Sequence, residues 1–144
     1  MQINKETLTG IALLLCLLIL SIEDIKEQKI NVLLALPIAV ATGSISLYLG
    51  MPSKTLLIAL IPGALLMLAA VFFPEKIGLG DGLTAALIGC GIGRAVFMAL
   101  FLSLFICSVL SLVLLALRKV NKNSKIPFVP FLTLGTGICV LFGA

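Results

Sequence analysis

Long runs of apolar residues, separated by short polar interruptions, make up most of this chain. Dividing the chain at these interruptions predicts six helical spans, at residues 8–22, 32–49, 55–73, 82–93, 95–117 and 127–141. Several of them reach or approach the roughly 20 residues that a membrane-spanning helix needs. The pattern therefore predicts an all-α polytopic membrane protein, built as one bundle of about six transmembrane helices.

The stretch from residue 82 to residue 117 has two interpretations. As one helix it would be a rod of roughly 54 Å, against a hydrocarbon core of about 30 Å. Two shorter spans that turn at Gly91-Ile92-Gly93-Arg94 fit a membrane better, because glycine permits a tight turn and the Arg94 side chain can reach the interface. We therefore expect a break in the helix at these four residues.

Composition and charge agree with a membrane protein and predict its orientation. Of the 144 residues, 61% are hydrophobic and only 11% are charged. This leaves too few polar residues to cover the surface of a soluble globular protein. The apolar spans leave no room for a soluble domain, so residues 1–144 are expected to form a single transmembrane domain. With six spans the basic residues divide three against seven between the two sides of the membrane: Lys5, Lys54 and Arg94 against Lys26, Lys29, Lys76, Arg118, Lys119, Lys122 and Lys125.

This unequal division predicts which side is which. By the positive-inside rule the larger group is cytoplasmic, and both termini are non-cytoplasmic. The basic residues lie between apolar spans and are not gathered on one amphipathic face. We therefore expect them to contact membrane lipids, and we expect no nucleic-acid partner.

The two aspartates of the chain are its best candidates for chemistry. Asp24 lies just past the first span and Asp81 just before the fourth, and the predicted topology places both at the cytoplasmic border. The sequence has no histidine, and its four cysteines lie in apolar runs without a CxxC pair, so we expect no metal site and no histidine-assisted nucleophile. A carboxylate pair that activates water is the natural hydrolytic alternative. Taken alone, Asp24 could be an interfacial charge near Lys26, and Asp81 could be a helix N-cap.

Two further segments have a pattern of their own. Gly78-Leu79-Gly80-Asp81 places two residues without side chains near a carboxylate, which would let the backbone of an extended peptide come close. By itself this tetrapeptide is a weak motif. The segment Ile126-Pro127-Phe128-Val129-Pro130-Phe131-Leu132 either starts a helix with its prolines and anchors it with its phenylalanines, or forms a rigid lining of a substrate groove.

Three separated segments resemble the prepilin peptidase family, the GxGD-type membrane aspartic peptidases that process type IV prepilins. Asp24-Ile25-Lys26-Glu27-Gln28-Lys29-Ile30-Asn31 is similar to the family's first-aspartate segment, Gly78-Leu79-Gly80-Asp81 to its second-aspartate motif, and Ile126-Pro127-Phe128-Val129-Pro130-Phe131-Leu132, followed by Gly135, to the start of its last span. Their order and spacing agree with the family over nearly the whole chain. Leu83 stands where the family usually has a lysine, and Ile30 where it has a proline. The chain also has no room for the cysteine-bearing insert of larger members, so it resembles a small, peptidase-only member.

The resemblance implies an aspartic endopeptidase without a cofactor, which cleaves the leader (signal) peptide of a prepilin-like membrane protein. Water held between Asp24 and Asp81 would attack the peptide bond at the cytoplasmic border of the cell membrane. The implied substrate-binding residues are Gly78, Gly80, Pro127, Phe128, Pro130 and Phe131. A basic leader would also suit three acidic residues on the same side, Glu23, Glu27 and Glu75.

Two other functions use the same residues. The chain could be a small proton- or ion-coupled transporter or channel subunit that relays charge through the two aspartates, or an inactive assembly factor descended from the peptidases. Transport favours carboxylates near the middle of the membrane, whereas both aspartates here lie at the ends of predicted spans. The peptidase is therefore the preferred hypothesis.

Overall fold

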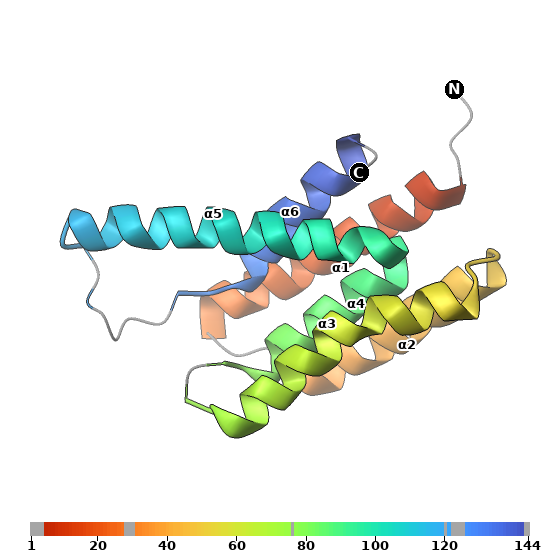
Figure 1. Cartoon of the computed structure of the whole chain (residues 1–144), viewed down its shortest axis with the longest axis horizontal. Helices are drawn as coiled ribbons and strands as arrows, with labels where there is room; N and C mark the ends of the chain where they lie inside the picture. Colours follow the sequence, from red (N-terminus) through yellow and green to blue (C-terminus); the bar gives the residue numbers. More distant parts are fainter. Residues whose placement is uncertain (1–4, 28–30, 76, 120, 122–125, 143–144) are drawn as a thin grey trace.

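The computed structural model describes residues 5–27, 31–75, 77–119, 121 and 126–142. Of the positions used above, Gln28, Lys29, Ile30, Lys76, Lys122 and Lys125 lie outside these residues. Every regular element in the described part is helical (Figure 1), which confirms the all-α prediction. The elements are α1 (Lys5–Glu27), α2 (Val32–Tyr48), α3 (Ser53–Phe72), α4 (Leu79–Ile92), the short 3-10 helix η1 (Gly93–Ala95), α5 (Val96–Ala116) and α6 (Val129–Phe142).

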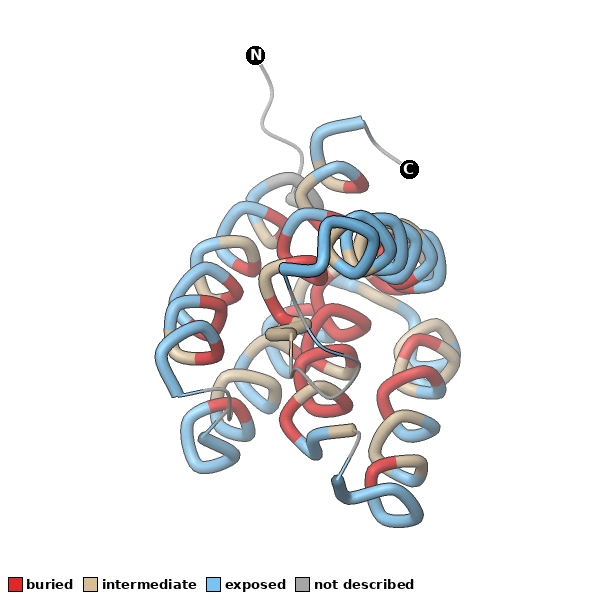
Figure 2. Tube along the Cα trace, turned by 90° about the vertical axis from the view of Figure 1, so that its left-hand side faces the viewer, coloured by how far each residue is buried: buried red, intermediate tan, exposed pale blue. Residues whose placement is uncertain are grey.

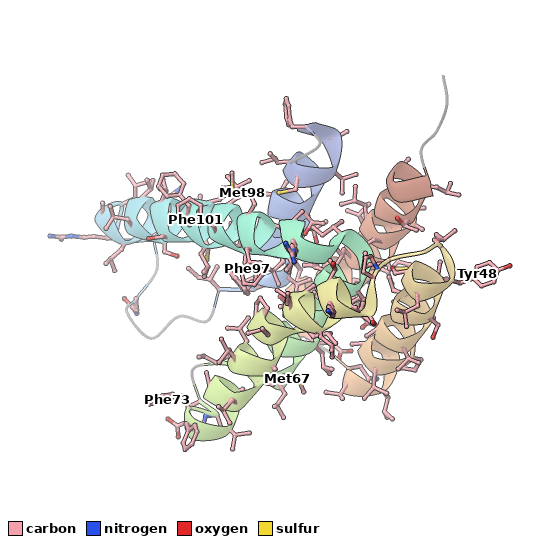
Figure 3. All side chains as sticks on the ribbon, turned by 45° about the vertical axis from the view of Figure 1, so that its right-hand side comes forward. Tyr48, Met67, Phe73, Phe97, Met98 and Phe101 are labelled. Atoms are coloured by element: carbon pink, nitrogen blue, oxygen red, sulfur yellow. The ribbon has the colours of Figure 1, made fainter. Side chains whose placement is uncertain are left out.

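Three helical stretches are long and apolar enough to cross a membrane, at Leu8–Glu27, Ser53–Phe72 and Leu79–Ala116. α2 and α6 are shorter apolar helices, of 17 and 14 residues. Large apolar side chains cover the outside of the bundle, and Tyr48 and Phe73 point away from it (Figure 3). Such an extensive apolar exterior suits lipid better than water. The structure thus indicates a helical membrane protein, while six crossings and the sides of the two termini stay predictions.

The helices that carry the aspartates extend further than their apolar runs. α1 continues to Glu27 and not to residue 22, so Asp24 lies in its last turn and not in a loop. The polar residues after the apolar run include Glu and Lys, which are good helix formers and do not end a helix. α4 begins at Leu79, so Asp81 lies inside its first turn and not before it. In the segment from Ile126 to Leu132, α6 begins at Val129, two residues later than predicted.

The break predicted between the fourth and fifth spans is present. α4 ends at Ile92, and Gly93 has φ 59° and ψ −131°, a backbone conformation that glycine adopts more easily than other residues. η1 follows, and α5 leaves in a different direction (Figure 1). The stretch Leu79–Ala116 is therefore two helices, as the argument from helix length predicts.

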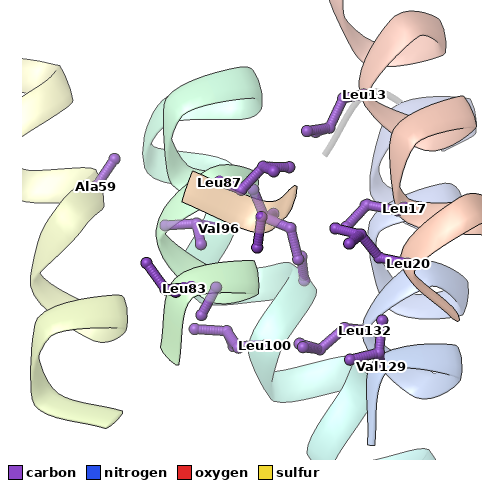
Figure 4. Packing of buried hydrophobic residues seen from close by; sticks show 14 of the residues in the cluster. Leu13, Leu17, Leu20, Ala59, Leu83, Leu87, Val96, Leu100, Val129 and Leu132 are labelled. Carbon is purple, nitrogen blue, oxygen red and sulfur yellow. The ribbon is translucent and has the colours of Figure 1, made fainter. Parts of the chain in front are cut away.

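α4 lies in the middle of the bundle (Figure 2). Ten of its 14 residues are buried, and α3 approaches it closely because glycines stand at the contact. A Cβ on Gly63 would lie 2.7 Å from the Cβ of Ala86, and one on Gly82 would lie 2.8 Å from the backbone nitrogen of Met67. On another side of α4, leucines of α1 and α6 complete a shared apolar core (Figure 4). This packing fixes the position of the first turn of α4, which carries Asp81.

Candidate active site

The C-terminal end of α1 and the N-terminal ends of α4 and α6 lie at the same end of the bundle (Figure 1). Asp24 is in the last turn of α1 and Asp81 in the first turn of α4. One turn before Asp24, Leu20 belongs to the same buried cluster as Leu83 of α4 and Val129 of α6 (Figure 4). The apolar core therefore ends where the two aspartates begin.

Asp24 is held by the first turn of α6. Its side chain is only 5% exposed. The backbone N–H of Val129 donates a hydrogen bond to Oδ2 of Asp24 at 3.1 Å, and the backbone N–H of Phe128 also interacts with this carboxylate. The first N–H groups of a helix have no partner within the helix, and this end of the helix dipole attracts an anion. The contact therefore gives the Asp24 carboxylate a hydrogen-bond donor and gives the first N–H group of α6 an acceptor.

Asp81 is held at the start of its own helix. The backbone N–H of Gly78 interacts with the Asp81 carboxylate, and the backbone N–H of Asp81 donates to the carbonyl of Gly78 at 3.1 Å. In this reciprocal arrangement an acidic residue near the third helical position satisfies the N–H of the N-cap residue. The explanation of Asp81 as the N-cap itself is thus wrong, because Gly78 occupies that position.

The two aspartates come close enough for their charges to interact. Electrostatic repulsion acts between the carboxylates of Asp24 and Asp81. Within the described part of the chain, no lysine or arginine offsets the charge of either one. Two carboxylates that share a site cannot easily both be ionised, so one of them tends to hold a proton. Chemically, such a pair can supply a base and an acid at the same time.

The three glutamates predicted on this side differ in their surroundings. Glu23 is half-buried, and its Oε2 is buried without a hydrogen-bond donor from the described residues. A buried carboxylate oxygen without a donor is unfavourable, so a donor from another molecule would stabilise it. Glu27 and Glu75 are exposed. The structure therefore separates Glu23 from the other two, which the sequence does not.

The segment from Ile126 to Leu132 contacts Asp24 through its backbone. The N–H groups of Phe131 and Leu132 donate to the carbonyl of Phe128, at 3.0 and 3.1 Å, so α6 starts here as the first of its two explanations predicts. Pro127, Phe128 and Pro130 are half-buried, and Phe131 is buried. Their role in lining a substrate groove stays a prediction.

Sequence reasoning missed Val129 as a residue of this site. Its side chain is fully buried in the apolar core, and only its backbone N–H reaches Asp24. The two prolines around it are the one available signal, because they remove other donors from the same turn.

The resemblance to the prepilin peptidases rests on three short segments. Of these, residues 24–27, 78–81 and 126–132 lie where the C-terminal end of α1 meets the N-terminal ends of α4 and α6. Leu83, at the position of the family's lysine, is 8% exposed and packs in the apolar core. It is therefore part of the packing of α4 and not of a polar surface. Compared with protein-family models, with curated proteins and with solved structures, the chain matches none of them.

Proposed function

We propose that the chain is an intramembrane aspartic endopeptidase of the prepilin peptidase type. The observation that carries this proposal is the convergence of Asp24 and Asp81, from two different helices, into one site where no lysine or arginine of the described residues offsets their charge. One carboxylate would accept a proton from a water molecule as its oxygen attacks the carbonyl carbon of the scissile peptide bond. The other would donate a proton to the carbonyl oxygen. The first aspartate would then pass the proton from water to the nitrogen as the C–N bond breaks, and the second would recover its proton as the new carboxyl group forms.

The proposed substrate is a prepilin-like protein, in which a short basic leader precedes one apolar helix. Gly78 is exposed, and a Cβ there would lie 3.6 Å from Oδ2 of Asp81. A larger side chain at this position would cover the carboxylate, so glycine keeps it open to a peptide backbone. Phe128 and the neighbouring prolines, beside Asp24, would contact the substrate from the α6 side.

Charge supports a cytoplasmic position of the site. Lys26, Arg118 and Lys119 are exposed and lie at the C-terminal ends of α1 and α5. These ends point to the same side of the molecule, whereas Lys54 of α3 and Arg94 of η1 lie toward the other side (Figure 1). By the positive-inside rule the end with the aspartates would face the cytoplasm of a cell membrane.

Processing of a prepilin-like substrate is the direct test. The purified protein in lipid vesicles is mixed with a substrate that has a lysine-containing leader and one apolar helix. We expect one cut, near the junction of the leader and the helix, seen as a shorter product by mass spectrometry. A failure to cut, together with proton flux into the vesicles that requires both aspartates, would favour the transporter instead.

Glu23 is expected to bind a basic residue of the leader, because its Oε2 is buried and receives no hydrogen bond from the part of the chain that the structure describes. Glu23→Gln should raise KM for the lysine-containing substrate about tenfold and change kcat little, the pattern for a group that binds ground state and transition state equally. Glu27→Gln is the matched variant. Its carboxylate is exposed, so its effect should be smaller.

A charge exchange tests the same contact in the opposite sense. Glu23→Lys should process the lysine-containing substrate poorly, and a substrate with glutamate in the leader should recover part of the lost rate. Equal rates for both substrates with the Glu23→Lys protein would contradict the assignment of Glu23 to the leader.

A further inference from the structure

We infer that the first turn of α6 is the positioning element of this site, and that the backbone N–H of Val129 fixes the orientation of the Asp24 carboxylate. The catalytic meaning of this inference rests on the proposed function. The contact itself is a hydrogen bond between Val129 N and Asp24 Oδ2 at 3.1 Å, across 105 positions of the chain.

The sequence around Val129 limits which donors α6 can offer. Pro127 and Pro130 have no backbone N–H. The N–H groups of Phe131 and Leu132 are both used by the carbonyl of Phe128. In this turn the donors left for an acceptor outside the helix are therefore those of Phe128 and Val129, and both interact with Asp24.

The surroundings hold this donor in place. Val129 is fully buried, and Asp24 is 5% exposed, so water competes little for the bond. One turn further along α6, the Thr133 hydroxyl lies within hydrogen-bond distance of the carbonyl of Leu17 in α1, at 3.4 Å, and of Val129, at 2.9 Å. On its other side α6 packs against α5, where a Cβ on Gly135 would lie 3.0 Å from the backbone nitrogen of Ser103. α6 therefore cannot shift along α1 without losing several contacts.

This hydrogen bond would give the two oxygens of the Asp24 carboxylate different roles in the reaction. The bond to Val129 engages Oδ2 and restricts rotation of the carboxylate. Oδ1 would then be the oxygen that faces the water molecule or the proton of Asp81. The side chain of Val129 is buried in the apolar core, so Val129 would act on the reaction only through Asp24, as a positioning residue.

Val129→Pro removes the donor and keeps a side chain of similar size. Proline is well tolerated at the first position of a helix, which is where Val129 stands. The matched variant is Val129→Ala, which loses side-chain packing but keeps the N–H. We expect Val129→Pro to have a kcat about tenfold below that of Val129→Ala, with similar KM values, because a hydrogen bond to a charged group is lost. Equal kcat values for the two variants would overturn the inference.

A second measurement does not depend on peptidase activity. Asp24→Ala is combined with Val129→Pro and, separately, with Val129→Ala, and unfolding rates of single and double variants are compared in detergent micelles. In the Asp24→Ala background the N–H of Val129 has no carboxylate acceptor left to lose. The factor by which Val129→Pro raises the unfolding rate should therefore be roughly threefold smaller there than in the wild-type background. Val129→Ala should have the same effect in both backgrounds.

The two measurements separate the two ideas. If the wild-type protein cut no substrate but the unfolding rates showed this coupling, the proposed function would fail and the positioning contact would stand. If Val129→Pro had the same effect on unfolding with and without Asp24, the positioning contact itself would be refuted, whatever the activity of the protein.

Discussion

Asp24→Asn and Asp81→Asn are each expected to lower the rate of substrate processing by at least about 100-fold, the usual size of an acid–base contribution. An asparagine can neither take a proton from water nor hold the shared proton. The replacement keeps the shape of the side chain. Its oxygen can still accept from the Val129 N–H at position 24 or interact with the Gly78 N–H at position 81. The loss should therefore come from chemistry and not from packing, and the vesicle assay with mass spectrometry measures it.

Lys54→Gln is a matched control for removing one charge. Lys54 is exposed near the start of α3, away from the end of the bundle that holds the aspartates, and its variant should process substrate at the wild-type rate. All three variants should insert into membranes equally. Processing within about tenfold of the wild-type rate by either asparagine variant would be too fast for a two-carboxylate mechanism.

Gly89→Ala is expected to destabilise the protein by roughly 1–3 kcal/mol, the range for overpacking a close contact. A Cβ on Gly89 would lie 2.9 Å from the carbonyl carbon of Ala59 and closer still to its oxygen. Alanine is favoured over glycine within a helix by about 0.5–1 kcal/mol, which acts in the opposite direction. The clash should outweigh this gain, because it meets the backbone of α3, which cannot turn aside as a side chain does.

Gly137→Ala provides the comparison on α6. Its Cβ would come no closer than 3.8 Å, to Cδ2 of Leu14, which is ordinary contact. Here only the helix preference of alanine remains, so stability should be unchanged or should rise by up to about 1 kcal/mol. The measurement is the free energy of unfolding in detergent micelles. A Gly89→Ala protein as stable as the Gly137→Ala protein would contradict the close approach of α3 to α4.

Hydropathy predicted the helical architecture better than it predicted the ends of the helices. The break at Gly93 could be foreseen, because the length of the apolar stretch and the glycines pointed to the same place. The end of α1 could not, because the apolar run stops at Ile22 while the helix continues through Glu23 to Glu27. Polarity marks where a helix leaves an apolar environment, whereas capping and backbone hydrogen bonds decide where it ends.

The candidate site was predictable where it depends on residue type. Asp24 and Asp81 are the only aspartates in a chain without histidine, so few hydrolytic mechanisms remained. The contact with Val129 was not predictable, because every residue except proline has a backbone N–H and only the fold selects one of them. The difference in burial between Glu23 and Glu27 could not be predicted from the sequence either. They lie one turn apart on one side of α1, and their different burial depends on where the neighbouring helices end.

If α4 and α6 cross the membrane, as the six-span hypothesis predicts, their shortness has a consequence for the lipid around the bundle. Each has 14 residues, which is about 21 Å of helix, whereas the hydrocarbon core of a bilayer is about 30 Å thick. Such hydrophobic mismatch is relieved when the bilayer thins locally around the part of the bundle that contains the short helices. Asp81 lies near the start of α4, and the start of α6 holds Asp24. Thinning at these two helix ends would bring the headgroup layer and its water down to the aspartates, so that water reaches the site without a channel through the protein.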